Sequence, residues 1–291
     1  MRKITLFILL ISIALLATGC QSDADAQIAT TTATVHSFTE YLCQETDIVV
    51  TQLITENVSC LHDYTLQTKQ MRMIENVDAI IVSGAGLETF LDKAITNAST
   101  VIDSSIGVSL ITCHLEHETD HGDHSHENDP HIWLSPANAQ LMAKNICAGL
   151  IALYPQHQLT FDRNLQKLID DLSALEQYGK AQLSNLTQKE IITVHDGFSY
   201  MADAFGLTIL HAIEEESGSE ASAAELIEIA QLINDNNMHC IFTERNGSTS
   251  AAQIISRETD ATIYELDMAM SEHDYFSAMY HNIDTLREAL E

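Results

Sequence analysis

The longest uninterrupted helical pattern in the chain covers residues 158–186, and it limits the folds open to the rest. This stretch contains no proline and a single glycine, Gly179. Its apolar residues recur at steps of three and four, the spacing of one helix face: Phe161, Leu165, Leu168, Ile169, Leu172 and Leu175. We predict one amphipathic helix of more than about 20 residues. A coiled coil is the alternative, but the repeat is short for one.

Short β-rich runs alternate with helical segments on both sides of this helix. Before it, we predict strands at 32–37, 47–54, 78–83 and 100–104, and helices near 38–45, 65–76, 87–96 and 137–153. After it, we predict strands at 190–194, 207–212, 240–243 and 262–266, and helices at 197–205, 222–236, 248–258 and 275–290. This alternation indicates parallel sheets covered by helices, so the predicted fold class is α/β. We divide the chain into an N-terminal lobe at 31–155, a linking helix at 156–188 and a C-terminal lobe at 189–291.

The first 20 residues have the order of a secretory signal, with Arg2 and Lys3 before an apolar run at 4–17. That run is short for a transmembrane helix. A cysteine directly after a small residue resembles the bacterial lipoprotein box, so we expect Cys20 to carry a lipid after cleavage. An ordinary cleaved signal is the alternative. We predict that residues 21–30 form a flexible tether. The signal and the lipid together imply a location outside the cytoplasm. The chain would be anchored to the bilayer of a bacterial membrane, at the cell surface or the periplasmic face.

The charge balance narrows the choice of partners. The formal net charge is −29, from 42 acidic and 13 basic residues. Nucleic acid phosphates would be repelled, so we expect no nucleic acid partner. The charge is compatible with attracting cations, although it can equally serve to solvate the surface. The cysteines include no CxxC motif, so neither a ribbon-type zinc site nor a thioredoxin motif is predicted.

Histidines are concentrated in a polar loop at 113–128. Imidazole is the commonest protein ligand of transition metals, so the tract predicts accessory metal contact by five side chains: His114, His117, His121, His124 and His126. A solvated acidic loop in which histidines cluster by chance is the alternative.

Four further side chains lie at the ends of predicted strands or beside predicted helices. His62 follows the second strand, His131 precedes a helix, His195 ends a strand, and Asp267 follows the last strand. Ligands of open α/β sheets collect beyond the carboxyl ends of strands. Two residues from each half could therefore converge on a cleft between the lobes, and three imidazoles with one carboxylate suit tetrahedral zinc. Each histidine alone would more often be a plain structural residue.

The motif DPHIWLSP at 129–136 resembles the DPHxWLDP signature of metal-binding lipoproteins that serve ABC transporters for zinc or manganese. Six more segments resemble motifs of that family in the same order, over nearly all of the mature chain. They begin at His62, Ser83, Val194, Glu220, Phe242 and Leu266.

The resemblance implies two α/β lobes bridged by a rigid long helix, with His62, His131, His195 and Asp267 as metal ligands between them. It implies no enzyme activity; the chain would capture Zn²⁺ and deliver it to a membrane permease. Histidine at the third ligand position and a His-rich loop before the second are typical of the zinc branch. We also expect Asp63 and Asp196 to orient the imidazoles.

Some residues depart from the family pattern. Cys60 and Leu61 stand where the family has other residues, including a proline, Ser135 replaces an aspartate, and Met268 replaces a proline. Cys60 and Glu244 are the alternative ligands. The alternative functions are a manganese-binding member of the family, a metal-dependent adhesin and a zinc hydrolase, although HExxH and GxSxG motifs are absent from the sequence.

Overall fold

The N-terminal half is built on a four-stranded parallel sheet. The computed structural model describes residues 26–56, 61, 64–95, 100–112, 128–214, 221–270 and 274–291. The strands lie in the order β2-β1-β3-β4, and every pairing is parallel. In chain order the elements are β1 (Ile28–Thr30), α2 (Ala33–Cys43), β2 (Val50–Gln52), α3 (Thr68–Asn76), β3 (Ala79–Val82), a 3₁₀ turn (Thr89–Leu91), α4 (Asp92–Ile95) and β4 (Thr100–Asp103).

The start of this half corrects one prediction. The strand predicted at 32–37 is wrong, because α2 begins at Ala33 and places Val35, Phe38 and Leu42 on its buried face. The first strand is β1, and it lies in the stretch 21–30 for which we expected a tether. It has only three residues, Ile28–Thr30, all buried between β2 and β3. A strand this short gives no alternation to read, and its position at the centre of the sheet buries it on both faces.

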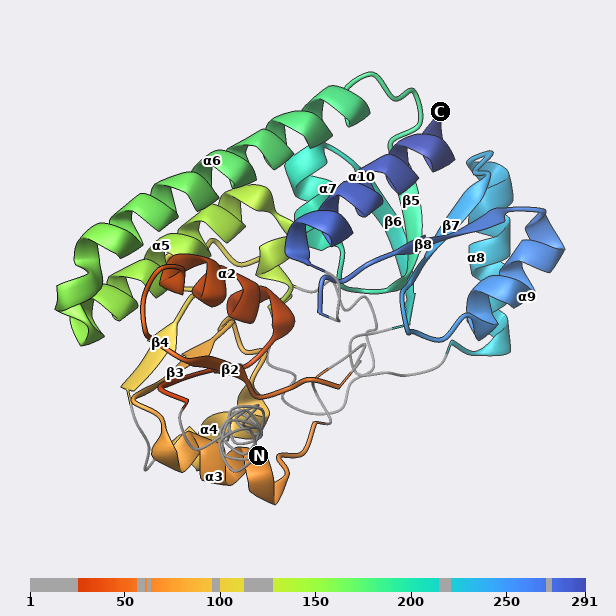
Figure 1. Cartoon of the computed structure of the whole chain (residues 1–291). Helices are drawn as coiled ribbons and strands as arrows, with labels where there is room; N and C mark the ends of the chain where they lie inside the picture. Colours follow the sequence, from red (N-terminus) through yellow and green to blue (C-terminus); the bar gives the residue numbers. More distant parts are fainter. Residues whose placement is uncertain are drawn as a thin grey trace, which may run out of the picture.

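The C-terminal half repeats the architecture, with the sheet order β6-β5-β7-β8 and all pairings parallel. Its elements agree with the predicted ones to within a few residues, and the predicted α/β class is confirmed. They are β5 (Glu190–His195), α7 (Ser199–Phe205), β6 (Thr208–Glu214), α8 (Ala223–Asp235), β7 (Cys240–Glu244), α9 (Ser250–Thr259), β8 (Thr262–Leu266) and α10 (Tyr275–Leu290). Helices α8 and α9 lie side by side at the outer end of this half (Figure 1).

The predicted long helix is α6 (Gln158–Leu183), a single helix of 26 residues. It follows α5 (Pro136–Leu153) and runs along one side of the molecule, past both halves (Figure 1). It packs against α2 and α5 of the first half and against α7 and α10 of the second. At Gly179 the helix meets Phe205 so closely that an added Cβ would lie 2.2 Å from the ring. This glycine is therefore needed for the close approach of α6 and α7.

One hydrophobic core extends from the first sheet through α6 to the second half. Its fully buried large side chains include Phe38 of α2, Trp133 before α5, and Tyr275 of α10. The rings of Phe38 and Tyr275 meet edge to face at 4.9 Å. A second, smaller cluster fills the space between β5, β7, α8 and α9. Because the main core is shared, the two halves are held as one body in which a large hinge motion would expose apolar surface.

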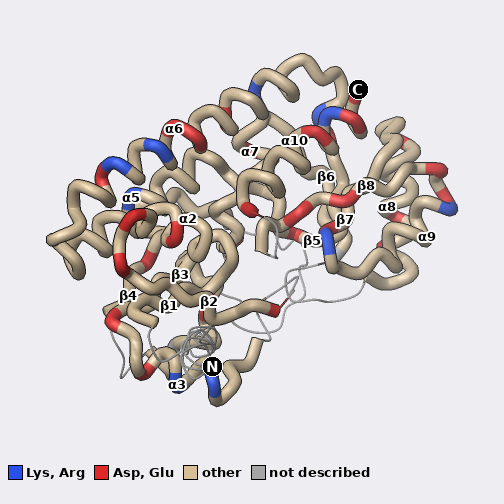
Figure 2. Tube along the Cα trace, viewed as in Figure 1, with Lys and Arg blue, Asp and Glu red and all other residues tan. Residues whose placement is uncertain are grey.

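Most charged residues of the chain are acidic. Asp and Glu residues lie along both halves, with fewer Lys and Arg residues among them (Figure 2). In the portion of the chain that the structure describes, none of the helices combines the length and the apolar character needed to cross a bilayer.

Candidate metal centre

Two segments of the C-terminal half present candidate ligands at the carboxyl edge of its sheet. Strand β5 ends at His195, and Asp267 directly follows the end of β8. His131 comes from the other half, where it precedes the 3₁₀ turn Ile132–Leu134 that leads into α5. Parallel strands end at the same edge, which is why residues distant in the sequence meet there.

The imidazole rings of His131 and His195 are neighbours. Their centroids lie 5.3 Å apart and their planes make an angle of 87°. Both residues are almost fully buried, with 2% and 6% of their surfaces exposed. Two imidazoles at this separation, one from each half, form a pair that a single cation could bridge.

Asp129 fixes the orientation and the tautomer of His131. Its Oδ1 lies 2.9 Å from Nδ1 of His131 and also accepts the backbone N–H of His131 at 2.9 Å. An ionised carboxylate can only accept, so Nδ1 carries the proton and Nε2 keeps its lone pair for a metal. Burial alone would raise the pKa of Asp129, but the hydrogen bonds from His131 and Ser199 outweigh it and hold this pKa below its usual range. The same role for Asp63 and Asp196 stays a prediction. We did not predict Asp129, although the spacing Asp-x-His was a usable signal.

His195 is confined by its neighbours on the other side of the pair. A Cβ added at Gly197 would lie 2.7 Å from Cδ2 of His195 and 2.8 Å from Cε of Met268. Glycine at this position therefore leaves room for the His195 ring and the Met268 side chain. Met268 directly follows Asp267, so the loop that carries the third candidate ligand comes close to Gly197.

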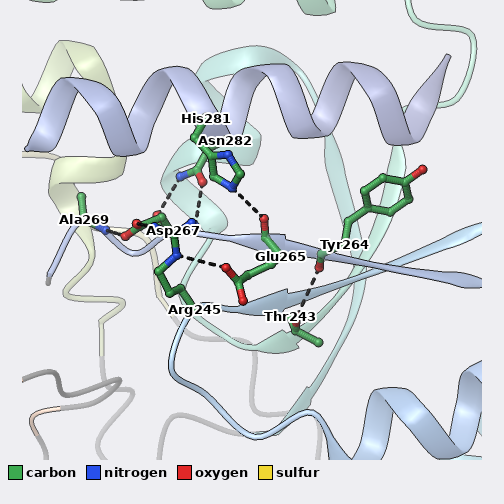
Figure 3. Close-up of polar contacts among 8 residues, drawn as sticks. All are labelled: Thr243, Arg245, Tyr264, Glu265, Asp267, Ala269, His281 and Asn282. Atoms are coloured by element: carbon green, nitrogen blue, oxygen red, sulfur yellow. Dashed lines mark hydrogen bonds and ion pairs between the residues drawn. The ribbon is translucent and has the colours of Figure 1, made fainter. Parts of the chain in front are cut away.

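Asp267 is held at its main chain and at both carboxylate oxygens. Asn282 of α10 brackets the main chain, accepting from the N–H of Asp267 at 2.7 Å and donating to its carbonyl at 2.7 Å. The carboxylate Oδ1 accepts the N–H of Ala269 at 2.8 Å. Oδ2 forms an ion pair with Arg245, 3.0 Å from its Nη1, and Arg245 donates through Nε to Glu265 at 3.0 Å (Figure 3). We did not predict Arg245, because no motif in the sequence places it near Asp267.

The loop after Asp267 is hydrogen-bonded to the N-terminal half. Trp133 donates its indole N–H to the carbonyl of Met268 at 2.8 Å, and Thr34 donates to the carbonyl of Ala269 at 2.8 Å. Tyr275 in turn donates to the carbonyl of Trp133 at 2.9 Å. The segments that carry His131 and Asp267 are therefore joined by direct hydrogen bonds between the halves.

Most of the other predicted site residues fall outside the part of the chain that the structure describes. The residues that lie outside the described ranges are Cys20, Cys60, His62, Asp63 and the five histidines of the tract at 114–126. Glu244, the alternative carboxylate, is buried at the end of β7 and packs against Gly247. Within the described ranges, no three His, Cys, Asp or Glu side chains are grouped closely enough to hold one ion. The structure thus brings His131 and His195 together, with Asp267 on the adjoining loop and paired with Arg245.

Comparisons with known proteins agree with this architecture. Residues 28–289 match the family described as zinc-uptake complex component A, periplasmic, or ZnuA. The zinc-binding lipoprotein AdcA of Streptococcus pneumoniae serotype 4 is 29% identical over 311 aligned residues, which cover 100% of this chain and 62% of AdcA. This chain therefore spans less than two thirds of that relative. A crystal structure of ZnuA superposes with a TM-score of 0.82 at 26% identity, covering 92% of this chain and 100% of the other. A zinc-bound deletion mutant of ZnuA gives 0.79 at 26% identity, over 92% and 99%.

Proposed function

The chain belongs to the ZnuA family of zinc-uptake components, and on that premise we propose that it captures Zn²⁺ outside the cytoplasm and delivers it to the permease of an ABC transporter. The observation that carries the proposal is the pair of buried rings of His131 and His195, brought together from the two halves. A buried imidazole pair, one member of which has its tautomer set by a carboxylate, is typical of a metal-binding site.

We assign four ligands to the cation: His62, His131, His195 and Asp267. Neutral imidazoles favour zinc, whereas manganese prefers harder oxygen ligands, so three imidazoles and one carboxylate fit Zn²⁺ better than Mn²⁺. A site with all four positions taken by protein leaves none for a reacting water. That is the arrangement of a carrier and not of a zinc hydrolase.

Delivery requires the ion to leave the site again, and the fold limits the movements that can release it. The shared core and helix α6 oppose a wide opening of the halves. Release then depends on small movements near the site, in which the loop at 267–270 and its hydrogen bonds to Trp133 and Thr34 take part. The imidazoles must be unprotonated to bind, so zinc affinity falls as the pH drops below about 6.5.

The flanking segments complete the proposal. Lipid on Cys20 would hold the protein at the outer surface of a membrane, beside the permease. The histidines of the tract at 114–126 would bind zinc weakly and raise its concentration near the tight site.

The experiment is calorimetric titration of the chain from residue 21 onward with Zn²⁺ and Mn²⁺, repeated after deletion of 116–127. We expect one tight zinc site in both proteins, weak additional sites only in the longer one, and much weaker manganese binding. Tighter binding of Mn²⁺ would instead assign the chain to a manganese carrier. Absence of any tight metal site would contradict the proposal and favour a metal-independent role such as adhesion.

A further inference from the structure

Arg245 places a positive charge against the carboxylate that we assign to the cation. Asp267 has 1% of its surface exposed, and its Oδ2 lies 3.0 Å from Nη1 of Arg245. A guanidinium and a dication that share one carboxylate repel each other, and the repulsion is weakly screened at a buried site. Any cation that uses Asp267 must therefore bind against the charge of Arg245.

Hydrogen bonds hold the main chains of Asp267 and Arg245 and one carboxylate oxygen of Asp267. Asn282 holds the main chain of Asp267, and the N–H of Ala269 holds Oδ1 (Figure 3). The backbone of Arg245 is fixed as well, because its N–H donates to the carbonyl of Leu266 at 2.8 Å. The guanidinium is the part that can adjust when a cation arrives.

Glu265 gives the guanidinium a second partner. Its Oε1 accepts from Nε of Arg245 at 3.0 Å, and its side chain is 52% exposed, against 2% for Asp267. The two carboxylates lie on the same strand end, two residues apart, with Arg245 across from them on the neighbouring strand end. Arg245 can thus keep an ion pair with the exposed carboxylate while it gives up part of its contact with the buried one.

We propose that Arg245 is an internal competitor for the charge of Asp267, and that it lowers the affinity for zinc to a level from which the ion can be delivered. This inference rests on the proposed function and deepens it, because Arg245 acts on the cation only through Asp267. In the metal-free protein the arginine neutralises a buried carboxylate, which would otherwise be costly. In the loaded protein it shifts towards Glu265 and leaves Asp267 to the cation.

The test is zinc affinity in Arg245→Gln, which removes the charge and keeps a polar side chain. We expect binding about tenfold tighter than in the unsubstituted protein. Arg257→Gln makes the same charge change at an exposed position in the last turn of α9 and should leave the affinity unchanged. If Arg245 instead only orients Asp267, Arg245→Gln will weaken binding, and that result overturns the inference.

Glu265→Gln supplies a second variant with the opposite expected sign. Without Glu265 the guanidinium loses one of the carboxylates that compete with Asp267 for it, so zinc should bind about threefold more weakly. In the Arg245→Gln background the same substitution should have no effect, because its action passes through the arginine. An equal effect of Glu265→Gln in both backgrounds would contradict the competition.

The two proposals fail in different ways. If the unsubstituted protein binds zinc tightly but Arg245→Gln binds it equally or less tightly, the inference on Arg245 is wrong and the carrier function stands. If neither protein binds zinc, the carrier function is wrong and the inference falls with it. Circular dichroism would show whether Arg245→Gln is unfolded without metal. If it is unfolded, the direction in which Glu265→Gln changes the zinc affinity decides whether the inference on Arg245 holds.

Discussion

The rings of His131 and His195 meet edge to face with their centroids 5.3 Å apart, although one precedes α5 and the other ends β5. If they hold one cation together, replacing either by alanine should lower zinc affinity by at least about 100-fold. His157→Ala is the matched control, because His157 pairs with Asp47 at 3.0 Å and is not part of the site. Titration calorimetry of the three variants would measure the effects, and an unchanged affinity in either site variant would contradict the pairing.

Asp129→Asn should weaken zinc binding without removing the ligand. The amide oxygen can still accept from His131, but the negative charge that supports the metal-bound imidazole is lost, so we expect a 10- to 100-fold lower affinity, as for other partners of metal-bound histidines. Asp203→Asn changes the charge equally at an exposed position of α7 and serves as the control. Equal affinities of the two variants would show that Asp129 has only a structural role.

Gly197→Ala should lower the zinc affinity, whereas Gly179→Ala should lower only the free energy of unfolding. The new Cβ at position 197 would lie 2.7 Å from the His195 ring, and displacement of that ring should reduce zinc affinity about tenfold or more. The new Cβ at position 179 would press on Phe205 and cost about 1–3 kcal/mol of unfolding free energy. Measuring affinity and chemical denaturation for both variants separates the effects. A normal affinity in Gly197→Ala would contradict the site geometry.

Glu88 makes the stability of the N-terminal half depend on pH. Its carboxylate accepts hydrogen bonds from Thr31 and from the N–H groups of Ser83 and Gly84. Burial nevertheless raises its pKa to about 7. Because this folded-state pKa lies above that of the unfolded chain, the contribution of Glu88 is greatest below the unfolded pKa and is lost as the pH rises through 7.

The effect is isolated by subtracting the unfolding free energy of Glu88→Gln from that of the unsubstituted protein at each pH. The difference should fall by on the order of 2 kcal/mol between about pH 5 and pH 8. Urea denaturation monitored by circular dichroism gives both values. A difference that does not change over this range would mean that Glu88 is already ionised in the folded protein at pH 5, and that its pKa is not raised.

Local patterns in the sequence predicted most of the fold and where part of the candidate site lies. The end of β5 at His195 and the position of Asp267 after β8 followed from the alternation of strands and helices. β1 was missed because a three-residue central strand has no periodicity. The contact of Arg245 with Asp267 depends on the pairing of β7 with β8, where Glu244 lies opposite Leu266, and strand neighbours cannot be read from one sequence.

The central claim is that one zinc ion lies between the halves, bound by His62, His131, His195 and Asp267. The most direct measurement is anomalous diffraction at the zinc edge from crystals of the zinc-loaded protein. We predict one dominant peak about 2.0–2.1 Å from the ring nitrogens of His131 and His195, with the carboxylate of Asp267 also coordinated. A dominant peak elsewhere, or one that does not contact both His131 and His195, would contradict the account.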